Sequence, residues 1–229
     1  MDTINKVKSI SIWIFIVPFI AINTCLILIT NFHELFPNKE HIIHNTIPYI
    51  DGGASISRTA RVFPTYLIFK PAMFLTAYLL IKYWLYIKSI IFNLHGEHKN
   101  LRKILIFGIG SAICLVIHSI FLGIKFDYDL YKLFRRVIML FFIIFEVVAQ
   151  AYLVITLYSI KDKLANLINA KFLKLKAILV SILIIVMIVS IPVVSMPGNK
   201  HIKHALEWDF FLGVILFYVL TFFMWKKQQ

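Results

Sequence analysis

Long runs of apolar residues dominate the chain, and the short segments between them carry most of its charge. A helix needs roughly 20 mostly apolar residues to cross the hydrocarbon core of a bilayer. Lipid cannot hydrogen-bond an exposed backbone, so runs of this kind are expected to be helical. The pattern therefore predicts an all-α, polytopic membrane protein built as a bundle of six transmembrane helices. The six runs lie near residues 10–30, 63–87, 104–124, 133–158, 177–196 and 205–225.

The composition supports this class. Of the 229 residues, 60% are hydrophobic and 15% are charged, against about 45–50% and about 25% in soluble domains. A water-facing domain with so few charged residues would expose too much apolar surface. No connection is long enough to fold alone, so we expect a single domain over residues 1–229. Its one long loop, at 31–62, is of a length that is usually functional or disordered.

The loop charges predict an orientation. Lys and Arg are modestly enriched in the amino terminus, the second and fourth loops and the carboxyl tail, while most acidic residues fall in the odd loops. The positive-inside rule then predicts that both termini are cytoplasmic. We interpret the net charge of +13 as basic loops beside anionic lipid. The expected partners are membrane lipids, with membrane-protein partners or a homo-oligomer left open and no nucleic acid. We expect the protein to lie in a plasma membrane, an inner membrane or an endomembrane.

Titratable side chains gather on the predicted outer side. His201, His204 and Glu207 recur at every third position, so a helix presents them along one face. His44 and Asp51, in the first loop, share that side of the membrane. The catalytic candidates are therefore His44, Asp51, His204 and Glu207, acting as acid and base.

A divalent cation is a second interpretation of this group, with His201, His204 and Glu207 as weak candidate ligands around an open position for water. The third interpretation is that these are solvated residues at a polar interface. No HExxH or Gly-x-Ser-x-Gly motif is present, so we expect no resident cofactor and leave open whether the protein is an enzyme.

Three polar residues fall inside predicted spans. Glu146 lies in the middle of the fourth span, with Gln150 one turn later on the same face, and Lys70 lies in the second span. An ionisable group at such depth usually faces the bundle interior. A bond from Glu146 to Gln150 or to a neighbouring helix is the simpler arrangement, and a pair with Lys70 on a proton or ion pathway is the alternative.

Two motifs resemble a known family. The segment from Pro48 to Arg58, followed by Arg61-Val62-Phe63, has a Pro-x-Ile-x-x-x-Gly/Ala pattern leading into the second span, and Glu207-Trp208 opens the last span. Both resemble the FRAG/DRAM/SFK family of six-span membrane proteins, which includes the amino-terminal region of CWH-type proteins and the post-GPI-attachment Golgi factor. The resemblance implies lipid-linked roles, such as the remodelling of lipid anchors. The chain departs from the family in the fourth span, where Arg135-Arg136-Val137 replaces a His and a Gly-Ala pair.

These observations favour lipid handling, meaning the binding or remodelling of a lipid or glycolipid headgroup at the outer face. Arg58 and Arg61 are the expected headgroup ligands. We also predict that the first loop folds back onto the start of the last span, where Arg58 or Arg61 would pair with Glu207. The alternatives are a non-enzymatic membrane adaptor and a small transporter that uses Glu146 and Lys70.

Overall fold

Six long helices form the protein in the computed structural model, which describes residues 2–124 and 128–226. They are α1 (Asp2–Asn31), α4 (Tyr66–His95), α5 (Leu101–Phe121), α6 (Asp129–Ser159), α8 (Ala170–Ser195) and α9 (Lys200–Met224). Each is long and apolar enough to cross a membrane. The short elements are η1 (His33–Leu35), η2 (Lys39–His41), α2 (Pro48–Asp51), α3 (Ile56–Ala60) and α7 (Lys161–Leu164). The prediction of an all-α protein with six transmembrane helices is confirmed.

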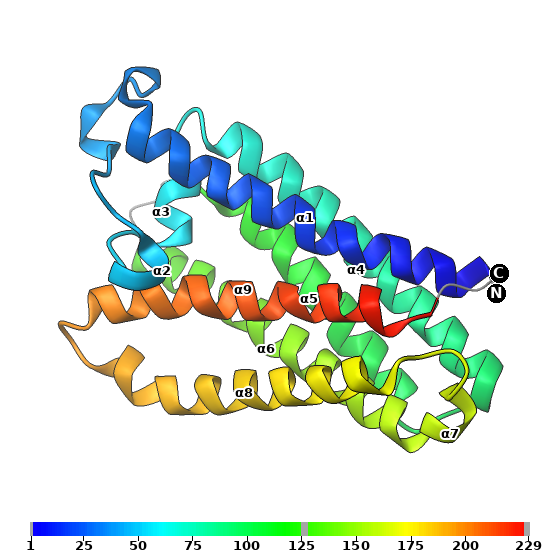
Figure 1. The fold of residues 1–229 in the computed structure, drawn as a ribbon. Helices are drawn as coiled ribbons and strands as arrows, with labels where there is room; N and C mark the ends of the chain where they lie inside the picture. Colours follow the sequence, from blue (N-terminus) through cyan, green and yellow to red (C-terminus); the bar gives the residue numbers. More distant parts are fainter. Residues whose placement is uncertain (1, 125–127, 227–229) are drawn as a thin grey trace.

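The start of α1 and the end of α9 lie at one end of the bundle, which we call the terminal end (Figure 1). The first loop, with α2 and α3, lies at the opposite end beside the start of α9, and we call this the loop end. The shared position of the termini follows from the even number of spans. Their placement in the cytoplasm remains a prediction.

Several helices run past the apolar segments that predict them. The first begins at Asp2 and not near residue 10, α4 continues to His95, and α8 begins at Ala170 and not near residue 177. The added turns carry lysines, among them Lys8, Lys88 and Lys174. Lysine is a good helix former, so the helix continues where the run of apolar residues has ended.

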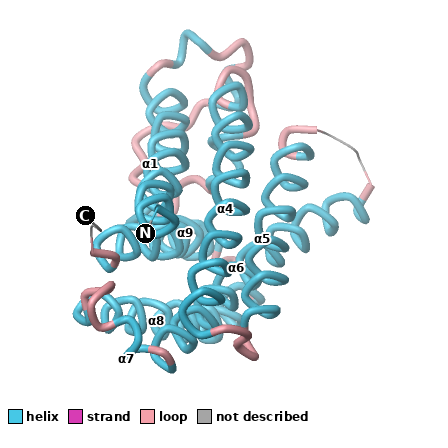
Figure 2. The backbone as a smooth tube through the Cα atoms, turned by 90° about the vertical axis from the view of Figure 1, so that its right-hand side faces the viewer, coloured by secondary structure: helices cyan, strands magenta, loops and turns pink. Residues whose placement is uncertain are grey.

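The six helices close into a ring. In ring order α1 contacts α4, then α5, α6, α8 and α9 follow, and α9 contacts α1 again. The helices α6, α8 and α9 meet around Val147, Leu183 and Val214. Toward the loop end, the first turns of α6 lie apart from α1 and α9 (Figure 2).

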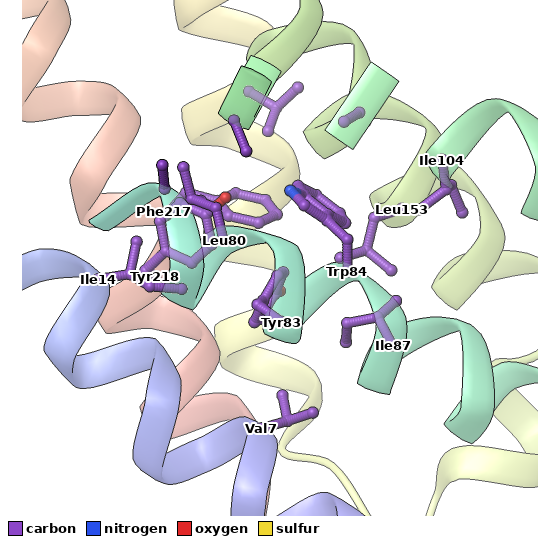
Figure 3. Close-up of a cluster of buried hydrophobic side chains, with 14 of the residues drawn as sticks. Val7, Ile14, Leu80, Tyr83, Trp84, Ile87, Ile104, Leu153, Phe217 and Tyr218 are labelled. Atoms are coloured by element: carbon purple, nitrogen blue, oxygen red, sulfur yellow. The ribbon is translucent and has the colours of Figure 1, made fainter. Parts of the chain in front are cut away.

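The terminal half of the ring is filled by large side chains (Figure 3). Tyr83 and Trp84 of α4 are fully buried between α5, α6 and α9, and Ile104 and Leu153 complete this packing. A Cβ atom at Gly108 would lie 2.5 Å from the Trp84 ring, so glycine lets α5 approach the indole closely. The bundle is therefore solid at its terminal end, and the interior space lies toward the loop end.

Candidate functional site

The first loop docks on the start of α9 through three ring N–H groups. His201 Nδ1 lies 3.2 Å from the Asp51 carbonyl, and His204 Nδ1 lies 2.9 Å from the Gly52 carbonyl. One turn further along α9, Trp208 Nε1 donates to the Ala54 carbonyl at 2.8 Å. These side chains repeat every three or four residues, so they form one stripe along the helix. The predicted contact between the first loop and the last span is present.

Gly52 makes this close approach possible. Its φ is +60°, in the left-handed region that favours glycine. A Cβ atom at this position would lie 1.8 Å from the backbone carbonyl oxygen of His201. The α9 backbone therefore occupies the space that any other side chain would need.

Asp51 stabilises the loop from within. Its carboxylate accepts hydrogen bonds from Thr46 Oγ1 at 2.7 Å and from the backbone N–H groups of Ile47 and Gly53, both at 2.8 Å. These bonds favour the ionised form, so they lower the pKa of Asp51 below its usual range. Among the candidate catalytic residues, this carboxylate is thus engaged by its own loop, and His44 is exposed with its ring against His33.

Glu207 finds a different partner from the one expected. Its carboxylate accepts hydrogen bonds from the backbone N–H groups of Ile56 and Ser57, at the start of α3. The first N–H groups of a helix have no partner inside the helix, so a carboxylate satisfies them well. Neither Arg58 nor Arg61 is among the groups that bind it in the described part of the chain.

The candidate metal ligands are used in the same way. The two histidine rings and the Glu207 carboxylate, which a metal site would need, each bind the backbone of the first loop. Within residues 2–124 and 128–226, no group of three His, Cys, Asp or Glu side chains is arranged to hold a metal ion. The stripe on α9 is therefore a docking surface for the loop.

A cavity of about 800 Å³ lies inside the ring at the loop end. Its walls are mostly apolar and come from every long helix except α8; they include Ile14, Met73, Leu115, Met139 and Ile215. Its depth follows α6 from Arg135 to Glu146, which at 1.5 Å per residue is roughly 16 Å. The cavity therefore combines apolar walls with polar groups at its two ends.

Basic side chains surround the loop end of this cavity. Arg61, Arg135, Arg136 and Lys203 line it together with Glu207. Burial and the positive charges of Arg135 and Arg58 lower the pKa of Arg61, so the Arg61 guanidinium lies in the electrostatic field of both. Arg61 also lines two smaller cavities of about 370 and 420 Å³ at the same end.

Gly123 helps to bring these charges together. Its φ is +86°, and a Cβ atom there would lie 2.7 Å from the Arg61 carbonyl oxygen. The backbone at Gly123, just after α5, can therefore pack directly on the backbone at Arg61. This contact holds the end of the first loop beside the two arginines of α6.

Two buried polar atoms beside the cavity have no hydrogen-bond partner among the described residues. They are His118 Nδ1 and Arg135 Nε. Both residues line the cavity, His118 is only 9% exposed, and its ring lies in the electrostatic field of Arg135. Buried polar atoms in folded proteins are nearly always hydrogen-bonded, so these two unpaired atoms, of which Arg135 Nε is a donor, mark a site for a polar ligand with acceptor atoms.

Glu146 forms the polar floor of the cavity. It is 1% exposed and accepts hydrogen bonds from Ser111 Oγ at 2.5 Å, from Gln150 Nε2 at 3.1 Å and from the Tyr218 hydroxyl. The predicted bond between Glu146 and Gln150 is present. Lys70 instead donates to the Ile120 carbonyl at 3.2 Å, so it is not among the hydrogen-bond partners of Glu146.

A second buried polar contact lies nearer the terminal end. Lys176 of α8 is 0% exposed, and its Nζ donates to Thr221 Oγ1 at 2.7 Å. The same ammonium lies 3.8 Å from the centroid of the Phe217 ring. A hydroxyl and an aromatic face thus take the place of a carboxylate partner.

Sequence reasoning named Arg61, Glu146 and Glu207 as candidate residues, but it did not assign Arg135 and Arg136 to the site. Arg135 and Arg136 occur six and seven residues into an apolar helix, where a charge is costly unless it meets water or a partner. The free-energy cost of placing two arginines in a membrane helix could have indicated a polar site at this position. His118 could be placed near the outer end of its span from the sequence, whereas the sequence offered no signal that Lys203 would face the same space.

Six membrane-spanning helices around an apolar cavity with a basic entrance place the chain in the class of multi-pass integral membrane proteins. The chain matches no protein-family model, no curated protein and no solved structure.

Proposed function

We propose that this protein binds a membrane lipid at the loop end, with the lipid headgroup at the basic residues and the hydrocarbon in the cavity. The observation that carries the proposal is the cavity of about 800 Å³ whose walls are apolar and whose entrance holds Arg61, Arg135, Arg136 and Lys203. Ligand pockets usually measure about 300–1,000 Å³ and combine apolar walls with a few placed polar groups. A lipid has the same division between an apolar body and a polar end.

The chemistry of each part favours a lipid over a polar solute. Met73, Met139 and Ile215 offer a hydrocarbon chain only van der Waals contact, and methionine adapts its shape to irregular ligands. Guanidinium groups bind phosphate oxygens in pairs and lose hydration more readily than ammonium groups. The proposal agrees with the lipid-linked roles that the resemblance to the FRAG/DRAM/SFK family implies, and membership of that family is part of the proposal.

The alternative functions find less support in the geometry. A transporter that uses Glu146 and Lys70 needs a polar pathway between them, but Lys70 binds the end of α5. Below Glu146, the bulky residues Tyr83 and Trp84 fill the terminal half of the bundle. A membrane adaptor would not need an internal cavity with a basic entrance.

Filling the cavity tests the proposal. Met139 lines the cavity on α6, and Leu133 of the same helix is 55% exposed. The protein is purified in mild detergent, and the lipids it retains are measured by native mass spectrometry. Met139→Trp should lose most of the retained lipid, because an indole occupies the space of a hydrocarbon chain. The matched control, Leu133→Trp, should retain as much lipid as the unchanged protein.

Two results would contradict the proposal. One is an unchanged protein that retains no lipid under conditions in which its helical content is preserved. The other is equal loss of lipid in Met139→Trp and Leu133→Trp, which would place the lipid on the outer surface of the bundle.

A further inference from the structure

The charges at the cavity entrance are unbalanced. Arg61 lies within electrostatic reach of both Arg58 and Arg135, and it lines the cavity together with Arg135, Arg136 and Lys203. Glu207 is the carboxylate that lines this end of the cavity, and two backbone N–H groups of α3 already bind it. Among the described residues, the entrance of the main cavity therefore carries four basic side chains, Arg61, Arg135, Arg136 and Lys203, against the single carboxylate of Glu207. Glu40 lies apart from this entrance, in the smaller cavity that Arg58 and Arg61 also line.

Two unpaired polar atoms on the cavity wall indicate which chemical groups the ligand must carry. Arg135 Nε and His118 Nδ1 are buried on the cavity wall without a partner in the described residues. A nitrogen of a guanidinium group can only donate a hydrogen bond. A group that satisfies Arg135 must therefore bring an acceptor atom, and the four basic side chains at the entrance favour a group with several acceptor oxygens and more than one negative charge.

We infer that the lipid recognised at this site carries a terminal phosphomonoester, held by Arg61, Arg135, Arg136 and His118. The inference rests on the proposed function, because it names the headgroup of the lipid proposed to occupy the cavity. A phosphomonoester has three free oxygens and a charge of about −1.5 to −2 at pH 7. A phosphodiester headgroup offers two free oxygens and a single charge, and a zwitterionic headgroup brings its own cation among the arginines.

The three oxygens match the arrangement of the donors. Arg61 reaches the site from the first loop, Arg135 and Arg136 from α6, and His118 from α5. Donors on three separate elements can surround a tetrahedral group, whereas a planar carboxylate would leave one side unfilled. Charge-assisted hydrogen bonds of this kind are roughly twice as strong as neutral ones.

A competition assay tests the inference. A fluorescent phosphatidic acid is bound to the purified protein in detergent and then displaced by phosphatidic acid, phosphatidylglycerol, phosphatidylcholine or inorganic phosphate. We expect phosphatidic acid to compete at least about tenfold better than phosphatidylglycerol, because a hydrogen bond to a charged group contributes about one decade or more in affinity. Inorganic phosphate should compete weakly, since it lacks the hydrocarbon.

Variants of Arg135 and Arg102 distinguish the loss of a ligand-binding charge from a general loss of folding. Arg135→Gln should weaken phosphatidic acid binding about tenfold or more, and Arg135→Lys should lie between it and the unchanged protein, since lysine keeps the charge but not the fork-shaped donor. Arg102→Gln is the matched control, because Arg102 is exposed at the terminal end of α5 and should bind normally. Variants are compared only where size-exclusion profiles match.

The outcomes distinguish the two proposals. Equal competition by phosphatidic acid and phosphatidylglycerol, or equal loss in Arg135→Gln and Arg102→Gln, would overturn the phosphomonoester and leave lipid binding intact. Equal competition by inorganic phosphate would show that the site binds a soluble phosphate, which overturns the lipid source. Absence of any lipid binding would overturn both.

Discussion

Gly52→Ala should open the first loop at its contact with α9. Alanine adds a Cβ atom 1.8 Å from the His201 carbonyl oxygen, although such contacts are essentially never shorter than 3.0 Å. The loop must then move by about 1.2 Å, as the difference between these two distances requires. The His204 bond to Gly52, now 2.9 Å, would exceed the usual limit for a hydrogen bond.

The expected magnitude has two parts. A non-glycine residue in the left-handed region costs about 1–2 kcal/mol. Displacement of the loop also weakens the bonds from His201, His204 and Trp208, each worth about 0.5–1.5 kcal/mol. The second part alone is therefore about 1.5–4.5 kcal/mol, which corresponds to about ten- to a thousandfold easier opening of the loop.

Gly198→Ala is the matched control. Gly198 also has a positive φ, +89°, and lies at the loop end, but a Cβ atom there would meet nothing within 4 Å. Hydrogen–deuterium exchange of a peptide covering residues 47–61 measures the opening directly. Exchange should accelerate strongly in Gly52→Ala and little in Gly198→Ala. If the two variants exchange alike, the docking contact does not stabilise the loop and our account of the α9 stripe fails.

Four further predictions concern other parts of the molecule. Glu146→Gln should preserve the melting temperature in detergent within a few degrees, because an amide can still accept the bonds to its carbonyl oxygen, whereas Glu146→Leu should lower it clearly by leaving buried donors unpaired. Lys176→Met should raise or preserve the same temperature, because it removes a buried ammonium that has no carboxylate among its described contacts; a large loss would contradict this. Asp51 has a pKa lowered from 3.8, so its contribution to loop stability should be complete well above pH 3.8 and disappear as the pH falls through the lower folded value. Tryptophan fluorescence followed from pH 7 down to the acid limit of the folded protein should show this change, and Asp51→Asn should remove it. Cysteines at Asn38 and Lys163 should label with an impermeant maleimide from outside and inside respectively, and labelling of the Lys163 position from outside would reverse the predicted topology.

The sequence determined the spans more fully than the site. Hydrocarbon thickness imposes a length on each apolar run, so the six helices could be counted without knowledge of their packing. The bond between Glu146 and Gln150 follows from helical spacing alone. Helix ends were less predictable, because Lys8 and Lys174 continue their helices beyond the apolar runs.

The site depended on contacts that sequence spacing does not encode. The docking of the first loop could be anticipated from its length and its glycines, but the partner of Glu207 could not. Charge complementarity suggested an arginine, whereas the backbone N–H groups of Ile56 and Ser57 lie in contact with the carboxylate. Likewise, no periodicity places Arg61, Arg135 and His118 on one cavity, because they come from three elements whose relative rotation is set by packing.

The contact between the first loop and α9 also sets an order for assembly in the membrane. Asp51, Gly52 and Ala54 leave the ribosome long before their partners on α9, which lie 150 or more residues later in the chain. Until that last helix inserts, the loop can pack on α1, but the carbonyl groups of Asp51, Gly52 and Ala54 lack their ring N–H partners. We therefore expect insertion of the α8–α9 hairpin to be the last step of assembly, because this hairpin completes both the helical ring and the cavity inside it.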